Sequence, residues 1–153
     1  MTYWLTIGTW DGWNTVTGKG ILEIPKKERK RFERMKTGDK VLYYTKVEFR
    51  PEGMLPSAVV GSAIVKQKIP GIPPEEITIS RAKEMLEPFR CQMKNINEFS
   101  TPVALHPLVE ELQCFDNKKR WTIYLTHPLQ EITEKDYTLI TSIHARHPVR
   151  MNL

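Results

Sequence analysis

Few residues of this 153-residue chain have the types and spacing that catalysis or metal binding needs. The phosphate-binding GxxxxGK(S/T) loop, the GxSxG nucleophile turn and the HExxH zinc helix are all absent from the sequence. His144 and His147 have the i,i+3 spacing that can place two imidazoles on one helix face, but Pro148 ends such a helix and no cysteine or carboxylate is near. We therefore predict no metal, no cofactor and no enzymatic activity.

Two tryptophans near the start of the sequence are better suited to binding a flat ring. Trp10 and Trp13 follow the first apolar run, and the turn formers Asp11, Gly12 and Asn14 predict a loop there. Stacking of a nucleobase on an aromatic side chain contributes about 1–3 kcal/mol. The two indoles could equally plug one end of a β-barrel, so both interpretations stay open.

Positive charge is concentrated in the first third of the chain. The sequence has 23 Lys and Arg against 18 Asp and Glu, and residues 1–50 hold 11 of the basic and 6 of the acidic residues, which is all of the net charge of +5. Basic residues are densest at 26–34, where they predict a charged helix face. This face is either only solvated, or it binds an anion, or it docks a protein partner. A second basic run, residues 118–120, directly precedes Trp121. It either contacts phosphates or is a solvated turn.

The hydrophobic pattern predicts several short strands and few helices. Apolar or alternating runs favour strands, and turn residues, prolines and caps delimit the helices. Strand-like runs lie at 3–8, 21–24, 40–47, 58–65, 89–96 and 120–126, and helices are expected at 26–36, 107–112 and 133–145. No connection has the regular strand–helix–strand form of a parallel sheet. The predicted fold class is α+β, a mixed, mostly antiparallel, partly closed β-barrel of five to six strands with peripheral helices.

Individual residues refine this architecture. Residues 40–47 and 58–65 are expected to pair as an antiparallel hairpin with a turn at 50–53, and Gly61 indicates a bulge or a close backbone approach. Adjacent Tyr43 and Tyr44 point to opposite faces of their strand, so one of them is expected in the core. Gly38 is expected to cap the basic helix at its C-terminus.

The remaining composition predicts a cytoplasmic protein. Cys91 and Cys114 have no CxxC spacing, which favours reduced, buried or half-buried thiols in a reducing compartment. The first residues lack a secretory signal pattern, and no apolar run approaches the roughly 20 residues of a membrane span. We expect one domain, residues 1–153, that is soluble and does not contact a membrane.

In their order along the chain, these residues resemble an EVE domain, a branch of the PUA-like superfamily related to the YTH readers of methylated RNA. The resemblance covers essentially the whole sequence and is greatest to small stand-alone prokaryotic members. The matching elements are Thr2-Tyr3-Trp4, Trp13, Ile24-Pro25-Lys26-Lys27, Thr37-Gly38-Asp39-Lys40-Val41, Val60-Gly61, Asn117-Lys118-Lys119-Arg120-Trp121 and Glu134-x-Asp136-Tyr137.

The resemblance implies a ligand pocket between the loop after the first strand, the segment before Pro25 and the neighbouring strand ends. In related readers a cage of aromatic side chains holds a modified base. Leu22 stands where relatives often carry a cage tryptophan, so a full aromatic cage is not expected. Carried over by position, three residues would border the pocket and three would contact phosphates as its basic rim; these are Thr9, Trp13 and Asn14, and Lys26, Lys27 and Arg120 respectively.

The predicted function is therefore a binding module for nucleic acid, RNA or modified DNA, or for a modified nucleotide. The full set of predicted ligand-binding residues is Thr9, Trp10, Trp13, Asn14, Leu22, Lys26, Lys27, Tyr44, Arg120 and Trp121. A protein adaptor that docks through residues 26–34 and a nucleotide-processing enzyme are the alternatives. The sequence leaves the oligomeric state, the ligand and the choice between RNA and DNA open.

Overall fold

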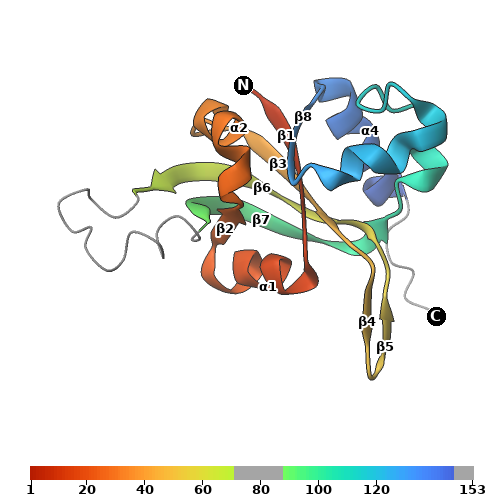
Figure 1. Ribbon diagram of the computed structural model, residues 1–153, viewed down its shortest axis with the longest axis horizontal. Coiled ribbons are helices and arrows are strands. Elements are labelled where there is room, and N and C mark those ends of the chain that lie inside the picture. The colour runs from red at the N-terminus through yellow and green to blue at the C-terminus, as the bar shows by residue number, and fades with distance from the viewer. Residues whose placement is uncertain (71–87, 147–153) are drawn as a thin grey trace.

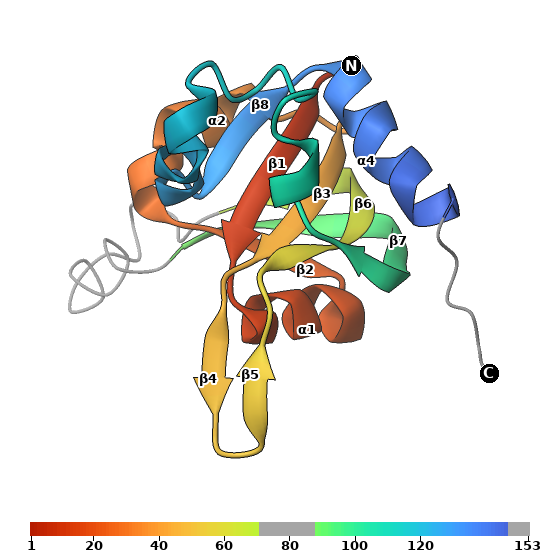
Figure 2. The same ribbon diagram turned by 90° about the vertical axis from the view of Figure 1, so that its right-hand side faces the viewer.

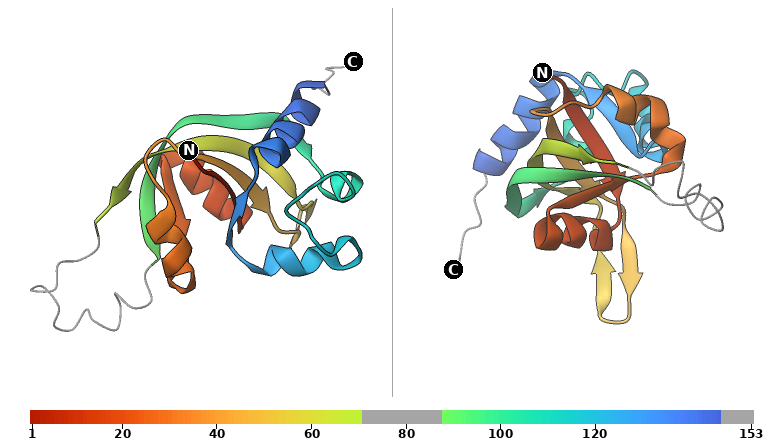
Figure 3. Two further views of the ribbon diagram at one scale, coloured as in Figure 1. Left: turned by 90° about the horizontal axis from the view of Figure 1, so that it is seen from above. Right: turned by 90° about the vertical axis from the view of Figure 1, so that its left-hand side faces the viewer.

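The computed structural model describes residues 1–70 and 88–146, and the side chains up to residue 143. Its centre is a six-stranded sheet with the strand order β2-β7-β6-β3-β1-β8, in which the long strands β6 and β7 bend strongly (Figures 1 and 3). The strands are β1 (Tyr3–Gly8), β2 (Ile21–Ile24), β3 (Lys40–Thr45), β6 (Ala58–Ile69), β7 (Phe89–Val103) and β8 (Leu129–Ile132). The sheet is a half-barrel, because β2 and β8 form its two edges.

The sheet is mixed and mostly antiparallel, as predicted. β1 and β3 run parallel, whereas β1–β8, β2–β7, β3–β6 and β6–β7 are antiparallel. The parallel pair was not predicted, because the chain between β1 and β3 makes a crossover of helix, strand and helix instead of one regular helix. The expected α+β class is confirmed.

Helices cover both faces of this sheet. They are α1 (Trp10–Lys19), the 3-10 helix η1 (Lys26–Glu28), α2 (Arg29–Arg34), the 3-10 helices η3 (His106–Leu108) and η4 (Lys118–Thr126), and α4 (Glu134–Arg146). The predicted helices at 26–36 and 133–145 are thus confirmed with small shifts at their ends. Gly38 is not the helix cap, because α2 already ends at Arg34, and Gly38 lies in the following turn with φ 94°.

The predicted loop at residues 9–14 was wrong, because α1 begins at Trp10. The Thr9 side chain accepts a hydrogen bond from the Gly12 amide at 3.0 Å, which caps the first turn. At the other end Gly20 adopts φ 70°, and its amide donates to the Val16 carbonyl. Caps at both ends stabilise a helix despite its turn-forming residues.

The predicted strand at 120–126 was also wrong, because this segment belongs to η4. Side chains three residues apart align in a 3-10 helix. Trp121 and Tyr124 accordingly both pack on Phe115, each with ring centroids 5.6 Å apart, while Ile123 is exposed. A strand, with its period of two, would place Ile123 in the core beside Trp121, whereas the observed period of three places Tyr124 there.

Alternating side chains divide the core into two clusters on opposite faces of the sheet. Trp4, Val41 and Tyr43 belong to the cluster on the first face, under α1 and α2. Leu42 and Tyr44 belong to the cluster on the second face, which also receives residues of η3, η4 and α4. In Figure 1, α1 and α4 lie on opposite sides of β6 and β7. Both tyrosines are therefore buried, where the sequence predicted at least one.

A separate two-stranded hairpin projects from the body of the molecule (Figures 1 and 2). Its strands are β4 (Glu48–Arg50) and β5 (Gly53–Leu55), so the turn expected at residues 50–53 is confirmed. Gly53 has φ 140°, a conformation that side chains rarely adopt.

Both cysteines are free, Cys91 buried and Cys114 half-buried, as predicted. Burial is the main cause that raises the pKa of each thiol to about 12. Among the described residues, no helix combines the length and the apolar character needed to cross a membrane.

Candidate nucleic-acid interface

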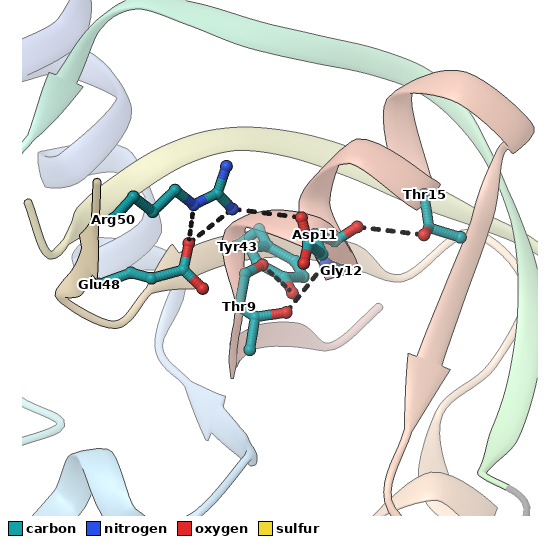
Figure 4. A network of polar contacts seen from close by, with 7 residues as sticks. All are labelled: Thr9, Asp11, Gly12, Thr15, Tyr43, Glu48 and Arg50. Atoms are coloured by element: carbon teal, nitrogen blue, oxygen red, sulfur yellow. Dashed lines mark hydrogen bonds and ion pairs between the residues drawn. The ribbon is translucent and has the colours of Figure 1, made fainter. Parts of the chain in front are cut away.

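The junction between β1 and α1, where the sequence predicts the pocket, is a tightly fitted helix start. The Tyr43 hydroxyl donates a hydrogen bond of 2.9 Å to the Thr9 carbonyl, while the Thr9 hydroxyl caps α1 (Figure 4). A Cβ at Gly8 or Gly12 would lie only 2.2 or 2.3 Å from the Tyr43 hydroxyl oxygen. The two glycines therefore form a notch that holds this hydroxyl and fixes the backbone of Thr9.

The same environment keeps Tyr43 protonated. Burial and the negative charge of Glu23 raise the pKa of Tyr43 far above its ordinary value of 10, and the hydrogen bond to the Thr9 carbonyl only partly opposes this. Tyr43 is thus a fixed hydrogen-bond donor at physiological pH. Its role at this junction is to position the backbone.

Trp13 is a core residue that closes the first face. It is 1% exposed, and its ring centroid lies 5.3 Å from that of Tyr43. A Cβ at Gly61 would lie 2.4 Å from the indole, which confirms the close approach predicted for this glycine. The indole N–H donates to Glu98 Oε1 at 3.1 Å. For Trp13, though not for Trp10, the burial agrees with the plug interpretation, and in this conformation no face of Trp13 is open to a ligand.

Trp10 is the tryptophan that remains partly exposed at this junction. It packs against the first-face cluster, and its indole nitrogen is buried without a hydrogen-bond partner among the described residues. Asn14 is exposed one turn further along α1. Leu22 is buried in the first-face cluster, so its side chain does not line an exposed surface.

A stack of two rings at the edge of the first face carries two lysines. The Phe32 and Phe89 rings are stacked with centroids 4.7 Å apart and planes within 7°. Lys26 Nζ lies 4.5 Å above the Phe89 ring, and Lys68 Nζ lies 4.7 Å above the Phe32 ring. The Lys68 ammonium also donates to the Glu33 carbonyl at 3.2 Å. We call Lys26, Lys27 and Lys68 the basic edge.

Lys68 was missed by sequence reasoning, because it is contributed by β6 and lies far along the chain from the basic helix. The available signal was weak. Lys66 and Lys68 continue an apolar strand with two cations on alternate positions, which is also typical of a solvated strand end. Only the fold brings Lys68 to the ring stack.

The arginines of the basic helix differ from its lysines. Arg29 pairs with Glu33 at 3.2 Å, Arg31 pairs with Glu28 at 2.8 Å, and Arg34 pairs with Glu131. Within the described parts of the chain, no carboxylate lies within ion-pair distance of the three lysines of the basic edge. The uncompensated positive charge is therefore on the lysines.

Three predicted ligand-binding residues lie on the other face of the sheet. Tyr44 is buried in the second-face cluster, and Trp121 packs against Phe115 and, at 6.1 Å, against His106. Arg120 is exposed on η4, next to Trp121. The sequence grouped these residues with Trp13, but the sheet separates them from it. The ten predicted residues therefore do not form one pocket.

Comparison with known proteins agrees with this fold. A UPF0310 protein of Pyrococcus abyssi is 32% identical over 144 residues, which cover 94% of this chain and 99% of that protein. The structure is similar to human THYN1 protein in complex with 5-methylcytosine-containing DNA, with a TM-score of 0.62 and 11% identity over 97% of this chain and 100% of that one. It is also similar to the MmI1 YTH domain, with a TM-score of 0.50 and 11% identity over 95% and 97% of the two chains. The EVE domain model matches residues 2–143, and the chain belongs to the EVE domain family.

Proposed function

We propose that this protein binds nucleic acid through the first face of its sheet, as a recognition module. The basic edge holds the phosphate backbone, and a base approaches the β1–α1 junction. The observation that carries this proposal is the pair of lysines, Lys26 and Lys68, that lie above the Phe32–Phe89 stack on the face that also holds the junction. The DNA complex of human THYN1, a protein of similar fold, supports the same partner class.

The basic edge suits a polyanion because its charges are held in place and left unneutralised. A cation over an aromatic ring gains about 0.5–1 kcal/mol at an exposed site, which limits the freedom of the ammonium group. Contacts of lysine with phosphates release condensed counterions and do not read sequence. The basic edge would therefore supply affinity, and the junction would supply any selectivity for a base.

Trp10 is the residue we assign to the base. It begins α1, it is only partly buried, and the hydrogen bond from Tyr43 to the Thr9 carbonyl fixes the backbone just before it. Because Leu22 is buried, the junction offers one aromatic wall and not the cage of several rings expected for a methylated base. The proposal therefore predicts stacking on a base without strong selectivity for a methylated one.

The protein-docking alternative has less support. A docking surface on residues 26–34 would draw on the arginines, yet Arg29, Arg31 and Arg34 already pair with carboxylates of this chain. An enzyme would need a positioned acid/base pair at the junction, and the one ionisable group held there by a hydrogen bond to the backbone, Tyr43, already uses its hydroxyl proton to hold the Thr9 carbonyl. We therefore propose binding without chemical conversion of the ligand.

Fluorescence anisotropy with labelled oligonucleotides tests this function. DNA and RNA probes, single-stranded and duplex, with and without 5-methylcytosine, would be titrated with the protein. We expect binding to at least one class, and we expect Trp10→Leu to weaken that binding by about 1 kcal/mol or more, because the variant loses the ring on which a base stacks. Thr17→Ala, an exposed change further along the same helix, is the matched control. Absence of binding to every probe would refute the proposal.

A further inference from the structure

The projecting β4–β5 hairpin carries an exposed apolar patch that the proposed function does not yet use. Phe49 is 79% exposed and Met54 is 58% exposed. The two residues are opposite each other in the register of the hairpin, so their side chains lie on the same face. They form one small patch on a ribbon that extends away from the body (Figures 1 and 2). We call Phe49 and Met54 the hairpin patch.

A surface ion pair connects the hairpin to the β1–α1 junction. A two-stranded hairpin is only marginally stable by itself. Arg50 donates to Glu48 at 2.6 Å and to Asp11, in the first turn of α1, at 3.2 Å (Figure 4). The tether joins the hairpin to the residue next to Trp10, the side chain assigned to the base. The single positive charge of Arg50 is thus shared between two carboxylates, Glu48 and Asp11.

The size of the patch distinguishes between types of occupant. A stable interface with a protein, including a second copy of this chain, buries about 800 Å² on each partner. One large aromatic side chain buries only about 150–250 Å². That area is nevertheless sufficient for insertion between two base pairs, and proteins that kink a duplex use Phe, Leu or Met as such wedges. The patch therefore fits a base step better than a protein surface.

We propose that the hairpin patch inserts into the base stack of a duplex, with Phe49 as the wedge and Met54 beside it. This inference rests on the proposed function and names its partner as a double-stranded nucleic acid. The cost of unstacking one step is a few kcal/mol, and the wedge offsets it by burying its ring against the neighbouring bases. The tether at Asp11 would keep the opened step close to Trp10.

The test uses the full chain and a short DNA duplex that contains 2-aminopurine, whose fluorescence rises when it is unstacked. We expect wild-type protein to increase this fluorescence. We expect Phe49→Ala to abolish the increase and to weaken duplex binding by about tenfold, while binding to the corresponding single strand is unchanged. Phe49→Leu should restore part of both signals, because it keeps an apolar wedge. Val47→Ala, a change at another exposed apolar residue just before the hairpin, is the control.

The outcomes separate the two proposals. If the wild-type protein binds no oligonucleotide, the proposed function itself fails. If it binds the duplex but Phe49→Ala binds equally well with the same 2-aminopurine signal, the wedge is refuted and the proposed function stands. Analytical ultracentrifugation tests whether a second copy of the chain occupies the patch instead. A dimer that Phe49→Ala dissociates would show this and would refute the wedge proposal.

Discussion

At the residue scale, the burial of Trp13 on the first face of the sheet depends on its close contact with Gly61. A Cβ at position 61 would lie 2.4 Å from the Trp13 ring and 2.5 Å from the Asn97 carbonyl oxygen. Neither group can move freely, because Trp13 is packed in the core and Asn97 is part of β7. We expect Gly61→Ala to lower the free energy of unfolding by about 1–3 kcal/mol, measured by urea denaturation.

Gly18→Ala is the matched control for this change. Gly18 lies in α1, and a Cβ there would meet no atom within 4 Å. Replacing a helical glycine with alanine should therefore raise the free energy of unfolding by about 0.5–1 kcal/mol. If Gly61→Ala proved as stable as Gly18→Ala, Trp13 could not be packed against Gly61, and the plug assignment would be wrong.

Single residues also show which contacts can be predicted from the sequence and which cannot. Gly61 indicated a bulge or a close approach, because these are the common reasons for a glycine inside an apolar strand, and the structure shows both. The residue that makes the approach, Trp13, could not be predicted, since it depends on a contact between distant parts of the chain. Alternation likewise predicted that Tyr43 and Tyr44 face opposite ways, but whether each face is covered depends on helices elsewhere.

At the element scale, the start of α1 depends on its cap more than on helix propensity. The segment contains Asp11, Gly12 and Asn14, all poor helix formers in a helix interior. We expect Thr9→Ala to lower the free energy of unfolding by about 1 kcal/mol, because the Gly12 amide loses its acceptor. Thr9→Ser keeps the hydroxyl and should be close to wild type in the same urea titration. Equal losses for both variants would show that the hydroxyl does not stabilise the helix.

Elements were predicted well where periodicity was long and poorly where local signals competed. The strand β3, the helix α4 and the first parts of β6 and β7 followed from their patterns, whereas the continuation of β6 to Ile69 and of β7 to Val103 was not predicted. Segment 9–14 was predicted wrongly because the Thr9 cap stabilises a helix despite its turn-forming residues. Segment 120–126 was predicted wrongly because its apolar residues also fit the alternation of a strand, whereas the segment forms a 3-10 helix with a period of three. The basic edge combines residues of η1 and β6. It could not be predicted from the sequence, because only the sheet topology brings these two elements together.

At the scale of the whole molecule, the buried thiols predict a loss of stability in alkaline solution. Burial raises the pKa of Cys91 and Cys114 from 9.0 to about 12. Between these values the unfolded thiols release protons that the folded protein retains, so the unfolded state binds fewer protons and stability falls as the pH rises. We expect a free energy of unfolding that is flat near neutral pH and decreases above pH 9, with a slope of at most about 1.4 kcal/mol per pH unit from the buried Cys91 and a smaller one from the half-buried Cys114.

The variant Cys114→Ser separates this effect from general alkaline denaturation. Serine does not ionise in this range, so the decrease above pH 9 should be less steep for the variant than for the wild type. Urea titrations at a series of pH values would measure both slopes. Identical slopes would mean that Cys114 does not contribute to the pH dependence.

The salt dependence of binding tests the central claim, that nucleic acid contacts the basic edge on the first face of the sheet. Each phosphate contact adds about 0.9 to the slope of log affinity against log salt concentration for duplex DNA. We expect the double change Lys26→Gln and Lys68→Gln to weaken binding and reduce this slope by about 1–2. The control, Lys119→Gln with Arg120→Gln, removes two exposed charges from η4 on the second face and should change neither quantity. A slope that depends on the η4 pair and not on the basic edge, or binding that is insensitive to salt, would contradict the account.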